Sequence, residues 1–136
     1  MKLLIVGGTG FIGKNLKNYF SKSDAYDVFA PTRKELNLSE DEACKNYLIK
    51  LKPDYIIHSA VDINSVENSL KAFFNIANNH EYFGHLVQIG SGAEYDRRQY
   101  FPLMTEECFS NQVPIDTYGI AKYSIANILE SNKSKK

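Results

Sequence analysis

The chain opens with a short apolar segment that runs directly into a turn with three glycines, and this junction constrains the fold more than any other feature. Residues 2–6 are rich in Leu, Ile and Val, the composition of a strand buried on both faces of a parallel sheet. Gly7, Gly10 and Gly13 follow at intervals of three. Apolar residues at helical spacing then predict a helix from about residue 10 to residue 22. The pattern predicts a strand, a tight turn and a helix at the start of an α/β fold.

The glycine spacing is Gly-x-x-Gly-x-x-Gly, not the Gly-x-Gly-x-x-Gly of the commonest dinucleotide-binding turn. Each glycine still has a mechanical role: Gly7 for the tight turn, Gly10 for close approach of the backbone to a pyrophosphate, and Gly13 for helix packing on the sheet. The free N–H groups of the helix would face the phosphates. A tight turn that binds nothing is the alternative interpretation.

The composition is that of one ordinary globular domain, with 43% hydrophobic and 24% charged residues. Acidic and basic residues are equal in number and form no basic stripe, so no nucleic-acid partner is expected. Cys44 and Cys108 lie far apart, and the histidines are not paired, so neither a metal site nor a disulfide framework is expected. No apolar run reaches membrane-spanning length, and the first strand leaves no room for a signal peptide. We therefore expect a cytoplasmic protein with no membrane partner.

Strand and helix patterns alternate along the whole chain. A capping box formed by Ser39 and Glu42 is expected to start the second helix. The predicted strands lie at residues 2–6, 26–30, 35–38, 55–58 and 86–89. The predicted helices lie at about residues 10–22, 40–51, 64–79 and 116–131. This alternation predicts an α/β, Rossmann-like fold with a doubly wound parallel sheet in the order 3-2-1-4-5.

The predicted domain organisation is one NAD(P)-binding Rossmann domain over residues 1–131, followed by a polar tail at residues 132–136. A complete six-stranded sheet would need at least one more strand after the last helix. The chain is therefore expected to be a truncated form of the fold. The long irregular segment at residues 94–115 is of the kind that is usually functional or mobile.

Arg33 lies twenty positions after Gly13, where this kind of fold discriminates between coenzymes. An acidic side chain there accepts hydrogen bonds from the ribose hydroxyls of NAD, whereas an arginine accommodates the 2′-phosphate of NADP. The position of Arg33 favours NADP, with NAD as the alternative. In the competing interpretation Arg33 and Lys34 are merely solvated, and Glu35 is close enough to serve as the acid.

Tyr118 and Lys122 stand four residues apart on the last predicted helix, one turn apart on the same face. This helix follows the strand whose carboxyl end carries Ser91. A hydroxyl, a phenol and an ammonium group could thus meet beside a nicotinamide ring. In the alternative interpretation Tyr118 covers a core and Lys122 is a solvated helix charge.

Hydride transfer to or from a carbinol carbon would require these three groups. A proton must leave or reach the carbinol oxygen, and a phenol with its ordinary pKa of about 10 is a poor base at neutral pH. Lowering a phenol pKa by about three units takes about 4 kcal/mol, which is about what one cation about 4 Å away supplies at an effective dielectric of about 20. A lysine at the position of Lys122 is a sufficient cause, and Ser91 would hydrogen-bond the substrate oxygen as charge develops.

The motifs GGTGFIG, HSA, IGSGAEY and YGIAK, in this order, resemble the extended short-chain dehydrogenase/reductases, the NAD(P)-dependent epimerase/dehydratase family that acts on nucleotide sugars. The PTRKELNL stretch is similar to that of the family's reductases and epimerase-reductases that use NADP. The resemblance covers essentially the whole chain and implies Ser91, Tyr118 and Lys122 as the catalytic residues. The expected cofactor-binding residues are Gly7, Gly10, Phe11, Ile12, Gly13, Arg33, Ser59, Ala60, Tyr118 and Lys122.

The chain departs from the family pattern in two places. It is shorter by about one helix-and-loop unit between His58 and Ser91, and it ends right after the YGIAK helix. By this resemblance the chain is expected to lack the family's C-terminal substrate domain, which supplies most of the nucleotide-sugar pocket. We therefore expect dinucleotide binding with weak or no turnover of a nucleotide-sugar substrate, because remote binding energy normally positions the reacting carbon. One alternative is a non-catalytic dinucleotide-binding module that regulates association with a partner protein. Another is a remnant that forms a homodimer through its last two helices.

Overall fold

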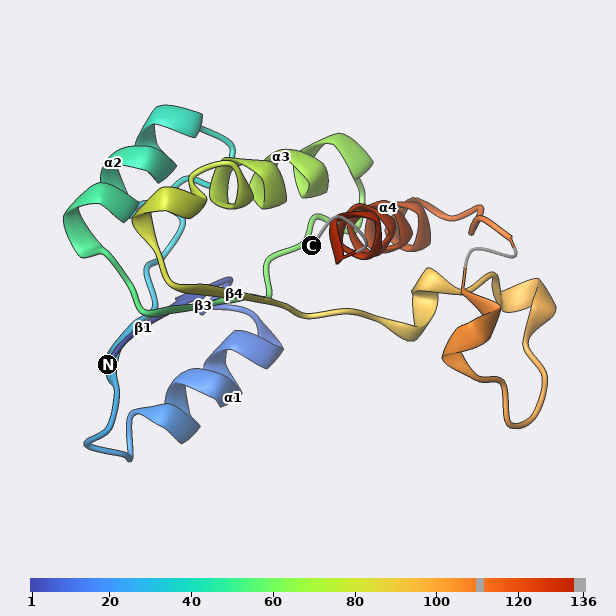
Figure 1. Cartoon of the computed structure of the whole chain (residues 1–136), viewed down its shortest axis with the longest axis horizontal. Coiled ribbons are helices and arrows are strands. Elements are labelled where there is room, and N and C mark those ends of the chain that lie inside the picture. The colour runs from blue at the N-terminus through green and yellow to red at the C-terminus, as the bar shows by residue number, and fades with distance from the viewer. Residues whose placement is uncertain (110–111, 134–136) are drawn as a thin grey trace. The chain divides into compact units, whose positions relative to one another are not determined.

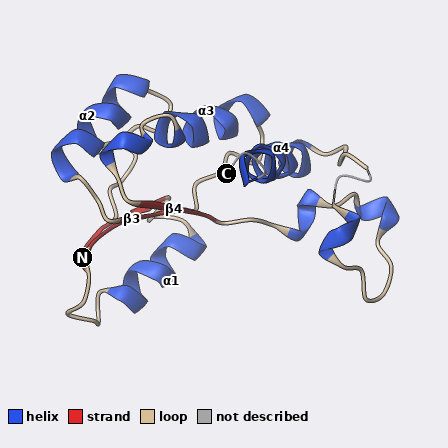
Figure 2. Ribbon diagram, in the orientation of Figure 1, coloured by secondary structure: helices blue, strands red, loops and turns tan. Residues whose placement is uncertain are grey.

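The computed structural model describes residues 1–109 and 112–133, so part of the predicted polar tail lies outside the described residues. Within these residues one parallel sheet contains four strands in the order β2-β1-β3-β4. Helices lie on both faces of this sheet (Figure 1). The strands are β1 (Lys2–Val6), β2 (Asp27–Phe29), β3 (Tyr55–His58) and β4 (His85–Gln88). The α-helices are α1 (Phe11–Phe20), α2 (Asp41–Leu51), α3 (Val66–Ala77) and α4 (Thr117–Lys133) (Figure 2). No helix in the described part of the chain is long and apolar enough to cross a membrane.

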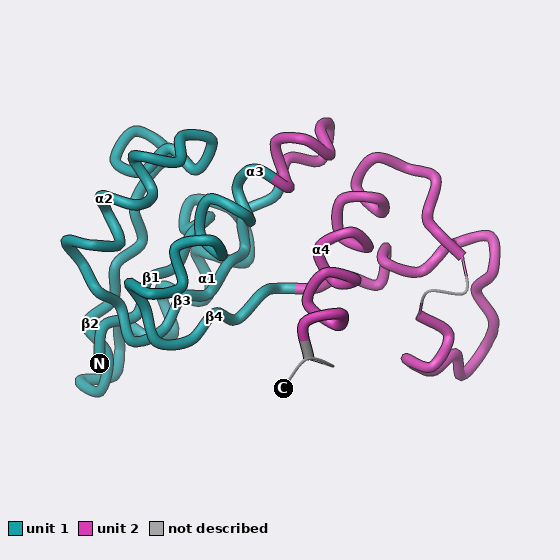
Figure 3. Tube along the Cα trace, turned by 45° about the horizontal axis from the view of Figure 1, so that its top comes forward, with its two compact units in different colours: residues 1–61, 71–89 teal, residues 62–70, 90–136 magenta. Residues whose placement is uncertain are grey.

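The chain divides into two compact units, which are described separately (Figure 3). The first unit is Met1–Val61 with Lys71–Ile89 and contains the sheet, α1 and α2. The second unit is Asp62–Leu70 with Gly90–Lys136 and contains α4 and three 3-10 turns. These turns are η2 (Gly92–Glu94), η3 (Arg97–Gln99) and η4 (Glu106–Cys108), while η1 (His80–Tyr82) belongs to the first unit. One of the three boundaries between the units, that between Leu70 and Lys71, falls within α3.

The central strand β1 is buried on both faces, as its apolar sequence predicts. Its side chains alternate between two core clusters. Leu4 and Val6 join the cluster that contains Leu48 of α2 and Ile76 of α3. Leu3 and Ile5 join the other cluster, against which Leu16 and Phe20 of α1 pack. Helix α1 accordingly lies on one face of the sheet, and α2 and α3 lie on the other (Figure 1).

The predicted strand at residues 35–38 is wrong. Residues 33–35 form a turn in which the Glu35 carboxylate accepts a hydrogen bond from the Thr32 backbone N–H, and Leu36 enters the core from this turn. A short half-apolar run carries too little periodicity to distinguish a strand from one buried anchor in a loop. The other four predicted strands all form and lie in the predicted order, so the α/β fold class is confirmed.

The predicted capping box at Ser39 is also wrong. Helix α2 has Glu40 as its N-cap, with no side-chain hydrogen bond to the helix. The Asn37 side chain accepts a hydrogen bond from the Ser39 N–H at 3.2 Å and donates one to the Glu40 carboxylate at 2.6 Å. Such local contacts of an asparagine favour a turn, which delays the start of the helix to Asp41.

Candidate functional site

The turn after β1 has no room for side chains at two of its glycines. Gly7 has a φ of +83°, which favours glycine, and an added Cβ there would lie 2.7 Å from the Ala60 nitrogen and 2.9 Å from Ser59 Oγ. An added Cβ at Gly13 would overlap the carbonyl oxygen of Gly7. The backbone of this turn therefore packs tightly against the first turn of α1 and against the residues that follow β3.

Ser59 joins the carboxyl ends of β1 and β3. Its N–H and its hydroxyl both donate to the carbonyl oxygen of Val6, at 3.0 and 2.8 Å. The structure thus brings the predicted pair Ser59 and Ala60 against Gly7. This edge of a parallel α/β sheet is where ligands of such folds generally bind.

The first turn of α1 is open to an anion. Gly10 is the N-cap, its N–H donates to the Gly7 carbonyl at 3.0 Å, and no acidic side chain lies in the first turn. Phe11 is 85% exposed and Ile12 is 44% exposed, so no apolar core covers this end of the helix. The unpaired N–H groups of a helix start attract negative charge, which suits a pyrophosphate.

Arg33 lies in the turn that follows β2, in the same unit as the glycine turn. Both Arg33 and Lys34 are exposed. The glycine turn and the turn after β2 lie close together at Gly8. A Cβ added there would lie 2.8 Å from the Cβ of Ala30, at the end of β2. The carboxylate of Glu35, the alternative acid, is instead bonded to Thr32.

In the second unit, Ser91 is the N-cap of η2. Its Oγ accepts a hydrogen bond from the Ala93 N–H at 3.2 Å, and Glu94 Oε1 accepts one from the Ser91 N–H at 2.7 Å. These two bonds form a reciprocal capping box, which fixes the backbone that carries the Ser91 hydroxyl. Sequence reasoning missed Glu94, although the Ser-x-x-Glu spacing could have indicated it.

Turn η2 packs against the start of α4, the helix that carries Tyr118 and Lys122. At Gly119 an added Cβ would lie 2.8 Å from the carbonyl oxygen of Ala93. The helix start is held by Asp116, whose carboxylate accepts a hydrogen bond from the Gly119 N–H at 2.8 Å. The structure therefore brings the turn that begins at Ser91 to the helix turn between Tyr118 and Lys122.

The two candidate groups on α4 differ in environment. Tyr118 is half-buried, whereas Lys122 is only 4% exposed. Burial lowers the pKa of the Lys122 ammonium, and the negative charge of Glu94 opposes that shift. Burial raises the pKa of Glu94, against the hydrogen bond from the Ser91 N–H and the charge of Lys122. Glu94 thus interacts with two of the three predicted catalytic residues.

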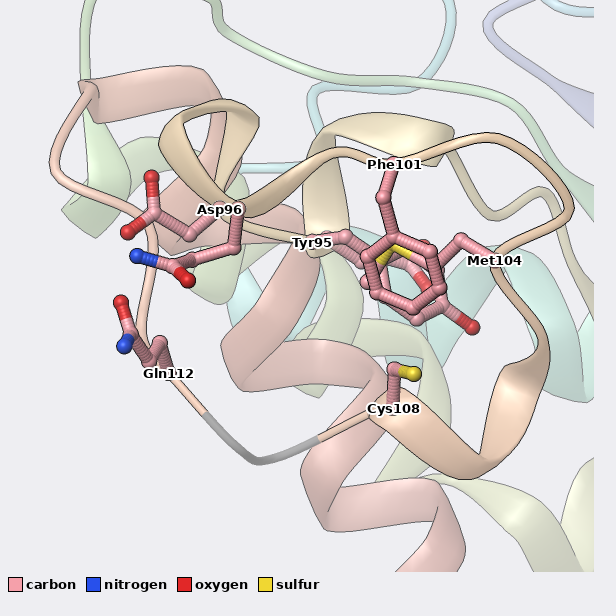
Figure 4. A pocket seen from close by; sticks show the side chains of 8 residues that line it. Tyr95, Asp96, Phe101, Met104, Cys108 and Gln112 are labelled. Carbon is pink, nitrogen blue, oxygen red and sulfur yellow. The ribbon is translucent and has the colours of Figure 1, made fainter.

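Glu94 also lines a pocket in the second unit, in the long segment that follows β4. The pocket has a volume of about 130 Å³. Asp96 and Gln112 lie on one side of it, and Phe101, Met104 and Cys108 lie on the other (Figure 4). Asp96 is 5% exposed and is paired with the guanidinium group of Arg98 at 2.6 Å. The segment that the sequence marked as irregular therefore forms a mixed polar and apolar pocket beside Glu94.

Comparison with known families identifies the class of the protein. The model of the NAD dependent epimerase/dehydratase family matches residues 3–136, so the chain belongs to this family. The family resemblance inferred from the motifs is thereby confirmed.

Two relatives with assigned activities match part of the chain. GDP-6-deoxy-D-talose 4-dehydrogenase of Aggregatibacter actinomycetemcomitans is 37% identical over 79 residues, which is 57% of this chain and 26% of that protein. GDP-L-colitose synthase of Yersinia pseudotuberculosis is 36% identical over 70 residues, 52% of this chain and 22% of that protein.

Solved structures share the fold over nearly the whole chain. A GDP-D-glycero-L-gluco-heptose synthase of Campylobacter jejuni, solved in the presence of NADPH, has a TM-score of 0.87 at 23% identity. A GDP-L-fucose synthetase of Naegleria fowleri bound to NADP has a TM-score of 0.82 at 22% identity. Each comparison covers 98% of this chain but 44% of the solved one. The chain therefore spans less than half the length of these structures.

Proposed function

We propose that this chain is the NADP-binding part of a nucleotide-sugar epimerase, dehydratase or reductase, with NAD as the alternative coenzyme. The observation that carries the proposal is the glycine turn. Gly7 and Gly13 have no side chain to cover the backbone there, and no acidic side chain lies in the first turn of α1. A pyrophosphate needs such bare backbone, because only unobstructed N–H groups reach its oxygens. Family membership and the NADP and NADPH in related structures support the same coenzyme class.

The preference for NADP is supported by the turn after β2. Arg33 and Lys34 are exposed there, and the Glu35 carboxylate is bonded to Thr32 and directed at its own turn. A guanidinium group suits a phosphate, because its N–H groups match phosphate oxygens in pairs. We expect Arg33→Ala to weaken NADPH binding by about 10- to 100-fold and to leave NADH binding nearly unchanged.

For the chemistry, we propose Tyr118 as the proton donor or acceptor at the substrate oxygen. The bound coenzyme supplies or accepts the hydride. The ammonium group of Lys122, one helical turn away, stabilises the phenolate, and the Ser91 hydroxyl hydrogen-bonds the substrate oxygen. The substrate class is a nucleotide sugar, with GDP-linked sugars the first to test because both relatives above are named for them.

The test is a hydride-transfer assay with NADPH and NADP across a panel of nucleotide sugars. Tyr118→Phe removes one oxygen and should lower any transfer by at least about 100-fold, with coenzyme affinity nearly unchanged. Tyr123→Phe, on the same helix, is the matched control. An equal loss of transfer and coenzyme affinity in Tyr118→Phe would refute the assigned role. Coenzyme binding without transfer on any sugar would favour the non-catalytic module.

A further inference from the structure

The turn after β2 is closed by a contact between Thr32 and Glu35. Glu35 Oε2 accepts a hydrogen bond from the Thr32 N–H at 2.7 Å and another from the Thr32 hydroxyl at 2.8 Å. In the reverse direction, the N–H groups of Glu35 and Leu36 donate to the Thr32 carbonyl at 3.0 and 2.9 Å. We call these four bonds the Thr32–Glu35 clasp.

The clasp engages the only carboxylate in the stretch from Pro31 to Leu38. An acidic side chain at this place in a dinucleotide-binding fold can bind the ribose hydroxyls, which selects NAD. Here one carboxylate oxygen already receives both Thr32 donors, and these bonds lower the pKa of Glu35. Glu35 therefore keeps its negative charge, and its carboxylate is held at Thr32.

The turn that the clasp closes exposes two cationic side chains. Arg33 and Lys34 lie between the two clasp residues and are exposed. Among the described residues, neither side chain makes a hydrogen bond or an ion pair. Thr32 is two residues from Ala30, which contacts Gly8 of the glycine turn. These two exposed cationic residues thus follow Ala30, the residue that contacts the glycine turn, by three and four positions.

We propose that the Thr32–Glu35 clasp determines coenzyme choice: it holds Arg33 toward the 2′-phosphate and keeps the Glu35 carboxylate away from the ribose. The inference rests on the proposed binding of NADP at the glycine turn. Thr32 and Glu35 are positioning residues in this account, and Arg33 is the group that contacts the phosphate. If the clasp opened, a carboxylate would become free beside a doubly charged phosphate, and repulsion would disfavour NADP.

The test measures dissociation constants for NADPH and NADH with the whole chain and its variants. Thr32→Val removes the hydroxyl donor but keeps the branched shape. It should lower the preference for NADPH over NADH by about 3- to 10-fold, the range expected for one hydrogen bond. Thr32→Ser keeps the hydroxyl and should stay within about twofold of the original preference. Retained NADH binding by Thr32→Val shows that the variant is folded.

A rescue variant separates the charge of Glu35 from its size. Adding Glu35→Gln to Thr32→Val removes the charge of the carboxylate that has lost one of its two Thr32 donors, and should restore most of the NADPH preference. An unchanged preference in Thr32→Val, or an equal loss of both affinities, overturns the inference. If Arg33→Ala weakens NADPH binding while Thr32→Val does not, the clasp is unimportant and the proposed coenzyme stands. If the original chain binds neither coenzyme, the proposed function fails and the inference fails with it.

Discussion

Lys122 carries a charged group where burial disfavours charge, and Glu94 is the charge that compensates. Both residues belong to the second unit, and Glu94 also accepts a hydrogen bond from the Ser91 N–H. A single carboxylate therefore fixes the turn that carries the hydroxyl and favours the ammonium form of the lysine. In the proposed mechanism this ammonium form is the active one, because only a cation stabilises the phenolate of Tyr118.

Replacing Glu94 with Gln should lower the pKa of Lys122. The opposing charge disappears, while the burial that lowers this pKa remains. The sign follows because a nearby negative charge favours the protonated amine, so its loss favours the neutral amine. The measurement is an NMR titration of the chain with labelled lysine, with Lys122→Arg to assign the signal.

Glu107→Gln provides the matched control for that titration. Glu107 is exposed on η4 and is not among the charges that act on Lys122. A midpoint for Lys122 that moves equally in both variants, or does not move in Glu94→Gln, would contradict the assigned interaction.

At the scale of elements, the approach of η2 to α4 depends on the absence of a side chain at Gly119. The contact at that point is with backbone, the carbonyl oxygen of Ala93, and with the Cβ of Pro114. Neither atom is the end of a flexible side chain, so an added methyl group must move one element from the other. The spacing between the turn that begins at Ser91 and the helix of Tyr118 would change with it.

Gly119→Ala should therefore lower the free energy of unfolding. Overpacking costs about 1–3 kcal/mol. The opposing gain in helix propensity is at most about 1 kcal/mol. Chemical denaturation measures the difference, and Gly92→Ala is the control, because an added Cβ there would lie 3.8 Å from the Tyr100 hydroxyl, an ordinary contact. A Gly119→Ala variant as stable as Gly92→Ala would show that the contact is not tight.

Elements with a strong apolar or glycine pattern could be predicted from the sequence, whereas the polar turns between them could not. β1 and the glycine turn were predictable because a buried central strand leaves a continuous apolar run and the turn needs glycine. The start of α2 was not, because polar side chains of the loop formed a competing turn. Three Ser/Thr-x-x-Glu patterns occur, beginning at Thr32, Ser39 and Ser91. Hydrogen bonds between the two ends form only in the first and last of these patterns, because at Ser39 the neighbouring Asn37 side chain forms a competing turn.

The candidate site was predictable to a similar extent. Gly7 and Gly13 followed from the mechanics of a tight turn, and Ser91, Tyr118 and Lys122 from family resemblance. Glu94 and Thr32 were missed because their roles are local hydrogen bonds, to the Ser91 backbone and to the Glu35 carboxylate, which composition and periodicity do not reveal. The Ser/Thr-x-x-Glu spacing indicates such a pair, but only the backbone shows whether it forms.

At the scale of the whole molecule, the proposed functions divide between the two units. The glycine turn, Arg33 and the Ser59–Ala60 pair belong to the first unit, and Ser91, Tyr118 and Lys122 to the second. The turn proposed to bind the pyrophosphate and the phenol proposed to transfer the proton therefore belong to different units. A substitution in the glycine turn should affect coenzyme affinity directly, whereas one on α4 should affect turnover.

Calorimetric titration of the chain with NADPH and with NADH tests the central claim, that the glycine turn binds a nicotinamide coenzyme. We predict saturable binding of NADPH, at least about tenfold tighter than NADH, as one charge-assisted contact to the 2′-phosphate would give. Gly13→Ala should abolish binding of both, since its methyl group overlaps the Gly7 carbonyl, whereas Lys14→Ala, an exposed neighbour, should not. No heat with either coenzyme, or undiminished binding by Gly13→Ala, would contradict the account.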